Sequence, residues 1–397
     1  MKRDNRITIA KALGIIMVVV GHTDGLHLLN TFIYEFHMPL FFICAGYFFS
    51  LKYLTHEGTF VGRRLKGLYV PFVKWSLFFL LIHNLMFRIG ILNEQYGNWS
   101  GGVTHPYNWQ QIQQRLWNIL FSMGGYDEFL AGAFWFFRGL FVASILYLLL
   151  YKVGVLLASR FSHYDVKGME RHGKLFRRTK MSSIIGLGIC VVLFGLCVWK
   201  AAAGLKIVIL VQGGSRDLMG CFFFGIGFLI KPVLNKFREI IAEKTFRIIA
   251  VDVVLFAVVL LFAIYDSSAM VFNPDLRRVL ALPIPAFCGF LLTYDISCRL
   301  DTIKDKSILK RFLIYCGNNT LIIFILHICA YKIVSVLKIM YYGLPWDEIG
   351  CHMTIHEHAD DFFWILYTIA GVGVPLLLQY GYDTIKVKSK KVKYKNP

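Results

Sequence analysis

Residues 7–25 read ITIAKALGIIMVVVGHTDG, an apolar run that carries one lysine, Lys11, and one histidine, His22. A helix that crosses the hydrocarbon layer of a membrane needs about 20 consecutive, mostly apolar residues. Basic residues precede the run as in a signal peptide, but it has no small-residue cleavage pattern. We therefore expect a retained first membrane helix.

The composition of the whole chain extends this interpretation. Of the 397 residues, 57% are hydrophobic and 17% are charged, whereas soluble domains have about 45–50% and about 25%. Too few polar residues are present to cover a soluble domain, and the dominance of apolar residues excludes a disordered chain, a collagen and a coiled coil. We predict an all-α fold, a polytopic membrane helix bundle that forms one domain over residues 1–397, with a basic cytoplasmic tail at 385–397.

About ten runs in the chain are apolar and long enough to cross a membrane. Most of the 43 Lys and Arg residues lie before the first run, in every second gap between runs, and in the tail. Because such residues stay on the cytoplasmic side, both termini are predicted to be cytoplasmic, and the net charge of +19 indicates membrane orientation rather than nucleic-acid binding. The predicted spans are roughly 7–25, 31–51, 67–88, 131–151, 182–200, 213–234, 248–265, 279–298, 312–336 and 362–384.

Several of these spans carry ionisable side chains that we place at a common depth. A helix rises about 1.5 Å per residue, so counting from the basic residue at the cytoplasmic end of each span puts most of them about 21–24 Å deep. Each could be hydrogen-bonded structure, but a shared depth indicates a polar site, because charge inside a membrane is costly. The six residues are His22, Glu35, His37, Arg138, Arg216 and His327.

Lys11 and His22 are predicted to share one face of the first helix. Eleven residues at about 100° each complete three turns plus about 20°, and they separate the two side chains by about 16 Å along the axis. This arrangement suits a long anionic ligand that enters from the cytoplasm, with its phosphates at Lys11 and its reactive end at His22. Snorkelling of Lys11 to the near interface is the open alternative.

These motifs resemble those of a known family. The run Ile9–His22 holds a basic residue, ten others and a histidine, which is the first-helix signature of the acyltransferase-3 family of membrane O-acyltransferases. Other segments are similar to the family in the same order, and they suggest the subgroup likened to fucose 4-O-acetyltransferases. One difference is Thr8, where members often carry Asp. The similar segments are Phe36–Phe49, Arg63-Arg64 followed by Pro71, Phe134-Trp135-Phe136 and Gly317–His327.

The resemblance implies an activity and a location. The donor would be acetyl-CoA or a related acyl-CoA from the cytoplasm, and the acceptor a hydroxyl of an extracytoplasmic glycan or glycolipid. The protein would be a multi-pass protein of the cell membrane, surrounded by membrane lipid, in a bacterial inner or plasma membrane. Direct transfer and transfer through an acyl-enzyme both remain open.

Each candidate residue then has an expected role. His22 would be the general base, since the pKa of an imidazole lies near working pH. Other polar groups near His22 would orient it or the sugar. Basic residues near the cytoplasmic side would bind the CoA phosphates, and side chains on other spans would contact the substrate. For Arg63 and Arg64, simple orientation charge is the alternative. The assignments are Glu35, His37 and His327 for orientation, Lys11, Arg63 and Arg64 for phosphate, and Trp135, Arg138 and Arg216 for substrate.

Two further interpretations stay open. A transporter or flippase of lipid-linked glycans would also bury charge, but transporters commonly show repeated halves and matching broken helices, which the sequence does not reveal. The segment Cys351–Asp361 contains His352, His356 and His358, residue types that bind metals. No metal signature matches it, so we expect no metal cofactor.

Overall fold

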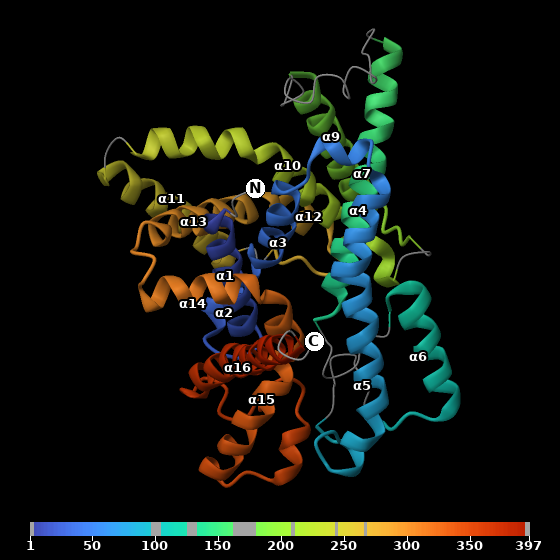
Figure 1. The fold of residues 1–397 in the computed structure, drawn as a ribbon, viewed down its shortest axis with the longest axis vertical. Helices are drawn as coiled ribbons and strands as arrows, with labels where there is room; N and C mark the ends of the chain where they lie inside the picture. The colour runs from blue at the N-terminus through green and yellow to red at the C-terminus, as the bar shows by residue number, and fades with distance from the viewer. Residues whose placement is uncertain are drawn as a thin grey trace. The chain divides into compact units, whose positions relative to one another are not determined.

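The computed structural model describes residues 4–96, 105–124, 133–161, 180–207, 211–242, 245–265 and 268–393. Throughout these residues the secondary structure is helical, with no β-strand (Figure 1), which confirms the all-α prediction. The longer helices are α1 (Asn5–Gly21), α2 (His27–Tyr34), α3 (His37–Tyr47), α4 (Glu57–Arg64), α5 (Val70–Arg88), α6 (Trp109–Ser122), α7 (Trp135–Phe161), α9 (Lys180–Ala202), α10 (Ser215–Ala242), α11 (Thr245–Tyr265), α12 (Leu276–Ala281), α13 (Pro283–Asp301), α14 (Ile308–Asn318), α15 (Thr320–Tyr342) and α16 (Phe363–Lys393). Short helical turns η1 (Leu51–Leu54), η2 (Leu65–Tyr69), η4 (Val211–Gly214) and η5 (Trp346–Gly350) join some of them.

Eight segments within the described residues are helical, long and apolar enough to cross a membrane. They correspond to eight of the ten predicted spans. The first predicted span is α1, whose 17 residues extend about 26 Å, near the lower limit for a crossing. The span predicted at 248–265 holds the apolar helix Ile249–Tyr265. The eight segments are His27–Tyr47, Glu57–Arg88, Trp135–Arg160, Met181–Ala202, Ser215–Leu234, Leu276–Asp301, Thr320–Tyr342 and Phe363–Lys386.

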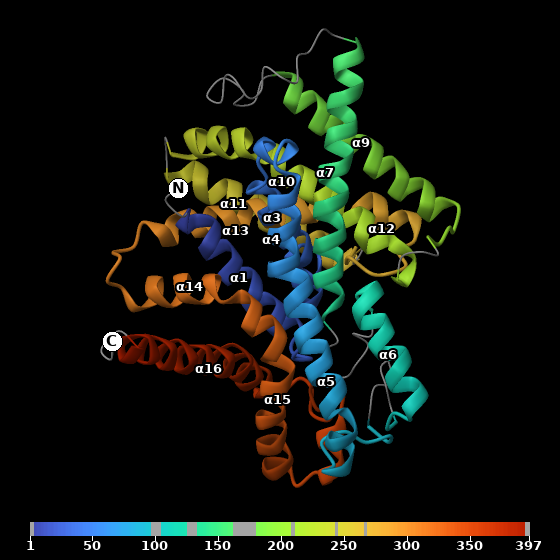
Figure 2. The same ribbon diagram turned by 45° about the vertical axis from the view of Figure 1, so that its right-hand side comes forward.

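Two predicted spans are interrupted where polar residues occur. The span 31–51 divides into α2 and α3, and Glu35 caps the end of α2. The span 312–336 divides at Asn319 into α14 and α15, which meet at a sharp bend (Figures 1 and 2). The assumption of one straight helix from Arg311 to His327, on which the depth of His327 rested, is therefore wrong.

By their contacts the helices form two compact units, the first of which comprises residues 1–37, 73–135 and 293–397. In this unit α1 packs against α2, α14, α15 and α16. A Cβ atom on Gly317 would lie 2.0 Å from the carbonyl oxygen of Thr8, so α14 approaches the backbone of α1 at this point. The glycine of the Gly317–His327 motif is thus required for close helix packing.

The second unit comprises residues 38–72 and 136–292. Here α10 packs against α9, and α3 crosses α10 with the two backbones in contact. A Cβ atom on Gly46 would lie 1.9 Å from the carbonyl oxygen of Phe224, and one on Gly227 would lie 2.1 Å from that of Ile43. Lipid tails are as apolar as the side chains, so helices in a membrane associate through close packing, which small residues permit.

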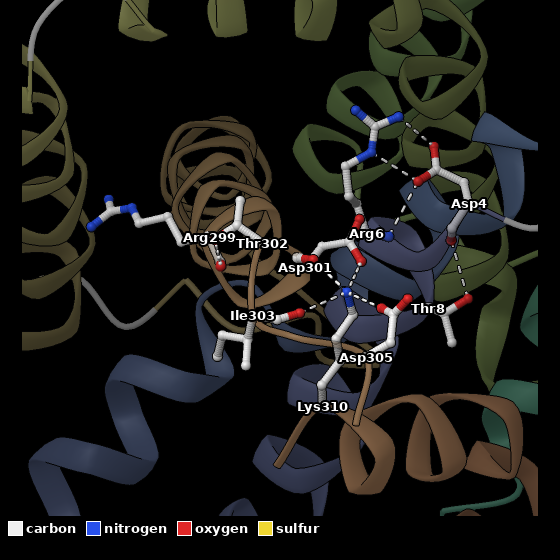
Figure 3. Close-up of polar contacts among 9 residues, drawn as sticks. All are labelled: Asp4, Arg6, Thr8, Arg299, Asp301, Thr302, Ile303, Asp305 and Lys310. Atoms are coloured by element: carbon white, nitrogen blue, oxygen red, sulfur yellow. Dashed lines mark hydrogen bonds and ion pairs between the residues drawn. The ribbon is translucent and has the colours of Figure 1, made fainter. Parts of the chain in front are cut away.

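The connection between α13 and α14, in the first unit, is fixed by a buried lysine (Figure 3). The Nζ atom of Lys310 lies 3.1 Å from Asp301 and 2.8 Å from Asp305, and it donates a hydrogen bond to the carbonyl oxygen of Ile303 at 3.1 Å. The hydrogen bond to Asp305 is the main cause that raises the pKa of Lys310. One of the basic residues counted for orientation therefore also holds a turn.

Candidate functional site

The first helix begins at a well-formed cap (Figure 3). The Asp4 side chain accepts a hydrogen bond from the Arg6 amide at 3.2 Å, as an N-cap does, and pairs with the Arg6 guanidinium at 2.9 Å. The Thr8 hydroxyl donates to the Asp4 carbonyl at 3.1 Å, and Thr8 is buried. At the position where relatives often have Asp, this chain therefore has a hydroxyl satisfied within the first turn of the helix.

The helix continues without interruption through Lys11 to Gly21, and His22 is its C-terminal cap. The face shared by Lys11 and His22 follows from this continuity, because the regular helical repeat is kept between them. Lys11 and His22 are each half-buried. The α1 helix therefore keeps the predicted separation of about 16 Å along its axis.

The His22 imidazole meets a second imidazole from α15. Its Nδ1 atom lies 3.0 Å from Nε2 of His327, although the two residues are 305 positions apart in sequence. The ring planes differ by 13° and the centroids are 5.2 Å apart. Because the nitrogens are much closer than the centroids, the rings meet edge to edge and nearly coplanar, which is the geometry of an N–H···N hydrogen bond.

The hydrogen-bond partners of His327 determine the direction of this bond. The Nδ1 atom of His327 lies 3.1 Å from the Ile323 carbonyl oxygen, which can only accept, so Nδ1 carries the proton. In the neutral ring Nε2 of His327 is then the acceptor, and Nδ1 of His22 must donate to it. The lone pair of His22 consequently resides on Nε2. His327 is fully buried, whereas His22 keeps part of its surface exposed.

The break between α2 and α3 brings further polar groups to this pair. Nδ1 of His37 donates to the Ile33 carbonyl at 2.8 Å, and the Tyr34 hydroxyl donates to the carbonyl of Gly21 at 2.9 Å. The rings of Tyr34 and His37 meet edge to face with centroids 5.0 Å apart. Glu35 is fully buried. His22 and His327 are thus in direct contact, and His37 lies at the break, next to the Tyr34 ring.

Tyr331 is a member of this group that the sequence analysis missed. Its hydroxyl donates to the Val19 carbonyl at 2.6 Å, and its ring meets that of His327 edge to face at 5.7 Å. It lies one helical turn after His327, and residues four apart share a helix face. That spacing was the signal that could have identified it.

In the second unit Arg138 has a specific partner. Its Nη2 atom lies 3.1 Å from Oδ2 of Asp217 in the first turn of α10, and both side chains are almost completely buried. Asp217 was not among the predicted residues, although an acidic residue inside an apolar run is a signal of a functional or structural site. Trp135, at the first turn of α7, is half-buried. Because removing either partner would leave an uncompensated buried charge, Arg138 and Asp217 are structurally interdependent.

Arg216 contacts a different segment from Arg138. Its Nε donates to the Met270 carbonyl at 3.2 Å, and its guanidinium lies 5.8 Å from the centre of the Phe272 ring. In this unit, therefore, Arg138 contacts α10 and Arg216 contacts the segment that precedes α12.

Arg63 and Arg64 end helix α4 and are followed directly by the π-helical turn η2. Arg63 donates to the Tyr53 hydroxyl at 2.7 Å, and the Arg64 guanidinium lies 4.9 Å from the centre of the Phe60 ring. Both residues therefore lie on a helix, and their expected role in binding phosphate stays a prediction. Pro71 has no N–H to donate, and a wide π turn immediately before it absorbs this loss.

The histidines after α15 do not form a metal site with their neighbours. Among the residues that the structure describes, no group of three or more His, Cys, Asp or Glu side chains could hold a metal ion. Nδ1 of His356 instead lies 2.7 Å from the Asp24 carboxylate. The segment therefore contacts the turn after α1.

A comparison with protein families matches this chain to the family described as acyltransferase domain, acyltransferase-3, over residues 4–380. The chain belongs to this acyltransferase family. No curated protein and no solved structure matches it. Together with the apolar helices, the membership makes the protein a multi-pass membrane acyltransferase, and it favours acyl transfer over the translocation of glycans.

Proposed function

We propose that this protein transfers an acetyl or related acyl group from cytoplasmic acyl-CoA to a hydroxyl of a surface or lipid-linked saccharide, at the outer face of the cell membrane. The observation that carries the proposal is the His22–His327 hydrogen bond. It leaves Nε2 of a partly exposed His22 as the basic nitrogen, which is what a general base for a hydroxyl requires.

The reaction balances with one base. Nε2 of His22 takes the proton of the acceptor hydroxyl while its oxygen bonds to the thioester carbonyl carbon. The tetrahedral intermediate then collapses, the carbon–sulfur bond breaks, and the CoA sulfur leaves with the proton from Nε2. During this cycle the imidazolium of His22 is stabilised by the Nδ1–H···Nε2 bond to His327, since hydrogen bonds from charged donors are the stronger ones.

The donor would bind along the face of α1 that carries Lys11. The separation of about 16 Å between Lys11 and His22 is long enough to place an anionic portion at the lysine and the thioester at the imidazole. Arg63 and Arg64 are proposed to contribute to binding CoA phosphate, because guanidinium groups bind phosphate in a bidentate manner. The acceptor class follows from the family resemblance and from hydroxyl chemistry at His22.

The test is acyl transfer by purified variants in membranes. His22→Ala should lower kcat by about 10²- to 10⁴-fold, the usual contribution of a general base, while the protein still inserts in the membrane. His27→Ala changes an exposed histidine at the first turn of α2 and serves as the matched control. Release of free CoA from acetyl-CoA, with and without a glycan acceptor, reports the activity, and full activity in His22→Ala would refute the assignment.

The acceptor class can be tested in cells. Deletion of the gene should remove a mass equal to one acyl group from a surface glycan, as measured by mass spectrometry. Unchanged surface glycans, together with an active purified enzyme, would show that the acceptor belongs to another class.

A further inference from the structure

The segment between α15 and α16, residues 343–362, is fixed to α15 by two buried lysines. Nζ of Lys332 donates to the carbonyl oxygens of Ile349 and Cys351 at 2.6 and 2.7 Å, and Nζ of Lys338 donates to that of His358 at 2.9 Å. The two lysines are 8% and 1% exposed. Burying an ammonium group is costly unless it is hydrogen-bonded, so these contacts hold the main chain of the segment in one conformation.

The same segment is fixed on its other side to the turn after α1. Oδ2 of Asp24 accepts hydrogen bonds from the Thr354 hydroxyl at 3.0 Å and from Nδ1 of His356 at 2.7 Å. Burial raises the pKa of Asp24, but His356 and Thr354 outweigh it, and the pKa lies below its usual value of 3.8. Asp24 comes two residues after His22, so the segment is attached to the turn that directly follows this histidine.

His352 lies between these two attachments. The Lys332 contact fixes the residue before it, and the amide of Thr354 donates to the His352 carbonyl at 2.9 Å. His352 is half-buried and interacts electrostatically with His22, as His37 and His327 do. Burial, followed by the charges of Lys332 and His356, lowers the pKa of His352 to about 4. The imidazole is therefore neutral near pH 7, and a neutral imidazole has one donor and one acceptor nitrogen.

The segment also lies at the end of α1 away from Lys11. A donor that extends from Lys11 to His22 reaches the imidazole from the N-terminal side of α1. Residues 343–362 lie at the C-terminal end of this helix. The group that meets His22 from this second side is then the acceptor.

We propose that residues 349–356 form the acceptor-side wall of the site and that His352 hydrogen-bonds the acceptor hydroxyl. The inference rests on the proposed acyl transfer and assigns the second substrate of that reaction to this wall. The donor nitrogen of His352 binds a lone pair of the hydroxyl oxygen, while the hydroxyl proton points at Nε2 of His22. No proton is transferred to or from His352. It orients the nucleophile, which increases the fraction of bound acceptor in a reactive geometry.

The experiment uses the full chain in proteoliposomes with radiolabelled acetyl-CoA. The acceptor is the envelope glycan fraction from native cells that lack the gene, so that its hydroxyls are unmodified. His352→Ala should lower kcat/KM for the acceptor by about tenfold or more, the effect of one lost hydrogen bond of about 1.4 kcal/mol. His352→Gln, which keeps hydrogen-bonding atoms, should recover part of this loss, and His27→Ala should resemble the wild type.

A second readout separates the inference from the proposed function. The KM for acetyl-CoA should be unchanged in His352→Ala while kcat/KM for the acceptor falls, whereas His22→Ala should lose transfer at every acceptor concentration. Wild-type kcat/KM for the acceptor in His352→Ala would overturn the role of His352, and so would a raised KM for acetyl-CoA in this variant. If His352→Ala does not fold, His352→Gln decides between these outcomes. Absence of transfer by the wild type would overturn the proposed function and with it this inference.

Discussion

At the residue scale, the direction of each hydrogen bond determines which nitrogen of each histidine is basic. Histidines inside apolar runs are recognisable from sequence, and His22, His37 and His327 were identified in that way. The carbonyl of Ile323 then fixes the tautomer of His327, and His327 fixes that of His22. The basic nitrogen of the site is thus determined by a backbone oxygen that no sequence motif identifies.

The hydrogen bond from His22 to His327 predicts a graded effect of substitutions at His327. His327→Ala removes the acceptor for Nδ1 of His22 and should lower kcat by about 10- to 100-fold, since hydrogen bonds to charged groups contribute about 1.5–3 kcal/mol. His327→Gln offers a carbonyl oxygen in its place and should retain more activity. The donor KM should change little in both variants. Equal activity of His327→Ala and the wild type, measured by CoA release, would contradict a catalytic role of the His22–His327 hydrogen bond.

Arg138 illustrates how a residue-scale expectation is changed by structure. The sequence suggested an arginine available to the substrate, but Arg138 pairs with Asp217 at 3.1 Å. Asp217 is buried as completely as its partner, and its other oxygen, Oδ1, is buried and accepts no hydrogen bond within the described part of the chain. The pairing makes structural support the first role of Arg138, and a substrate role remains a proposal.

At the element scale, the site is built where helices end or break. His22 caps α1, and Glu35 and His37 flank the break between α2 and α3. Helix ends expose backbone groups that need partners, and in a membrane these partners must come from the protein. The Gly21 and Val19 carbonyls at the end of α1 accept from Tyr34 and Tyr331, which explains why aromatic hydroxyls gather around the histidines.

The contact between α14 and α1 leads to a prediction of stability. In Gly317→Ala the added Cβ would lie 2.0 Å from the Thr8 carbonyl oxygen, and the rigid backbone must move. We expect the free energy of unfolding to fall by about 1–3 kcal/mol, the usual cost of overpacking. Gly373→Ala in α16 is the control, because its Cβ would meet nothing within 4 Å, and it should be neutral or slightly stabilising. Thermal unfolding in detergent measures both, and an unchanged Gly317→Ala would contradict the close approach.

At the scale of the whole molecule, charge and hydropathy predict orientation. The net charge of +19 is concentrated in alternate gaps and in the tail, so both termini are expected in the cytoplasm. This orientation stays a prediction. It matters for function, because it would place Lys11 toward the cytosolic acyl donor and residues 343–362 on the opposite face.

Labelling of introduced cysteines tests this orientation. Glu357→Cys, at an exposed position between α15 and α16, should react with a membrane-impermeant maleimide on intact cells. Lys304→Cys, at an exposed position between α13 and α14, should react only after permeabilisation. All nine native cysteines lie within the described residues as buried or half-buried thiols, so their background labelling should be low. The reverse pattern would invert the assignment of donor and acceptor sides.

Local patterns in the sequence were enough to predict the membrane class, the helical fold, nearly all the spans, and the common face of Lys11 and His22. These properties depend on hydropathy and on the helical repeat, which act over a few neighbouring residues. Three contacts could be found only in the folded chain: His22 donates to His327, Arg138 pairs with Asp217, and Asp24 holds the segment around His352. Each of these contacts joins residues far apart in the chain, and their directions follow from packing and from the need to satisfy every buried polar group.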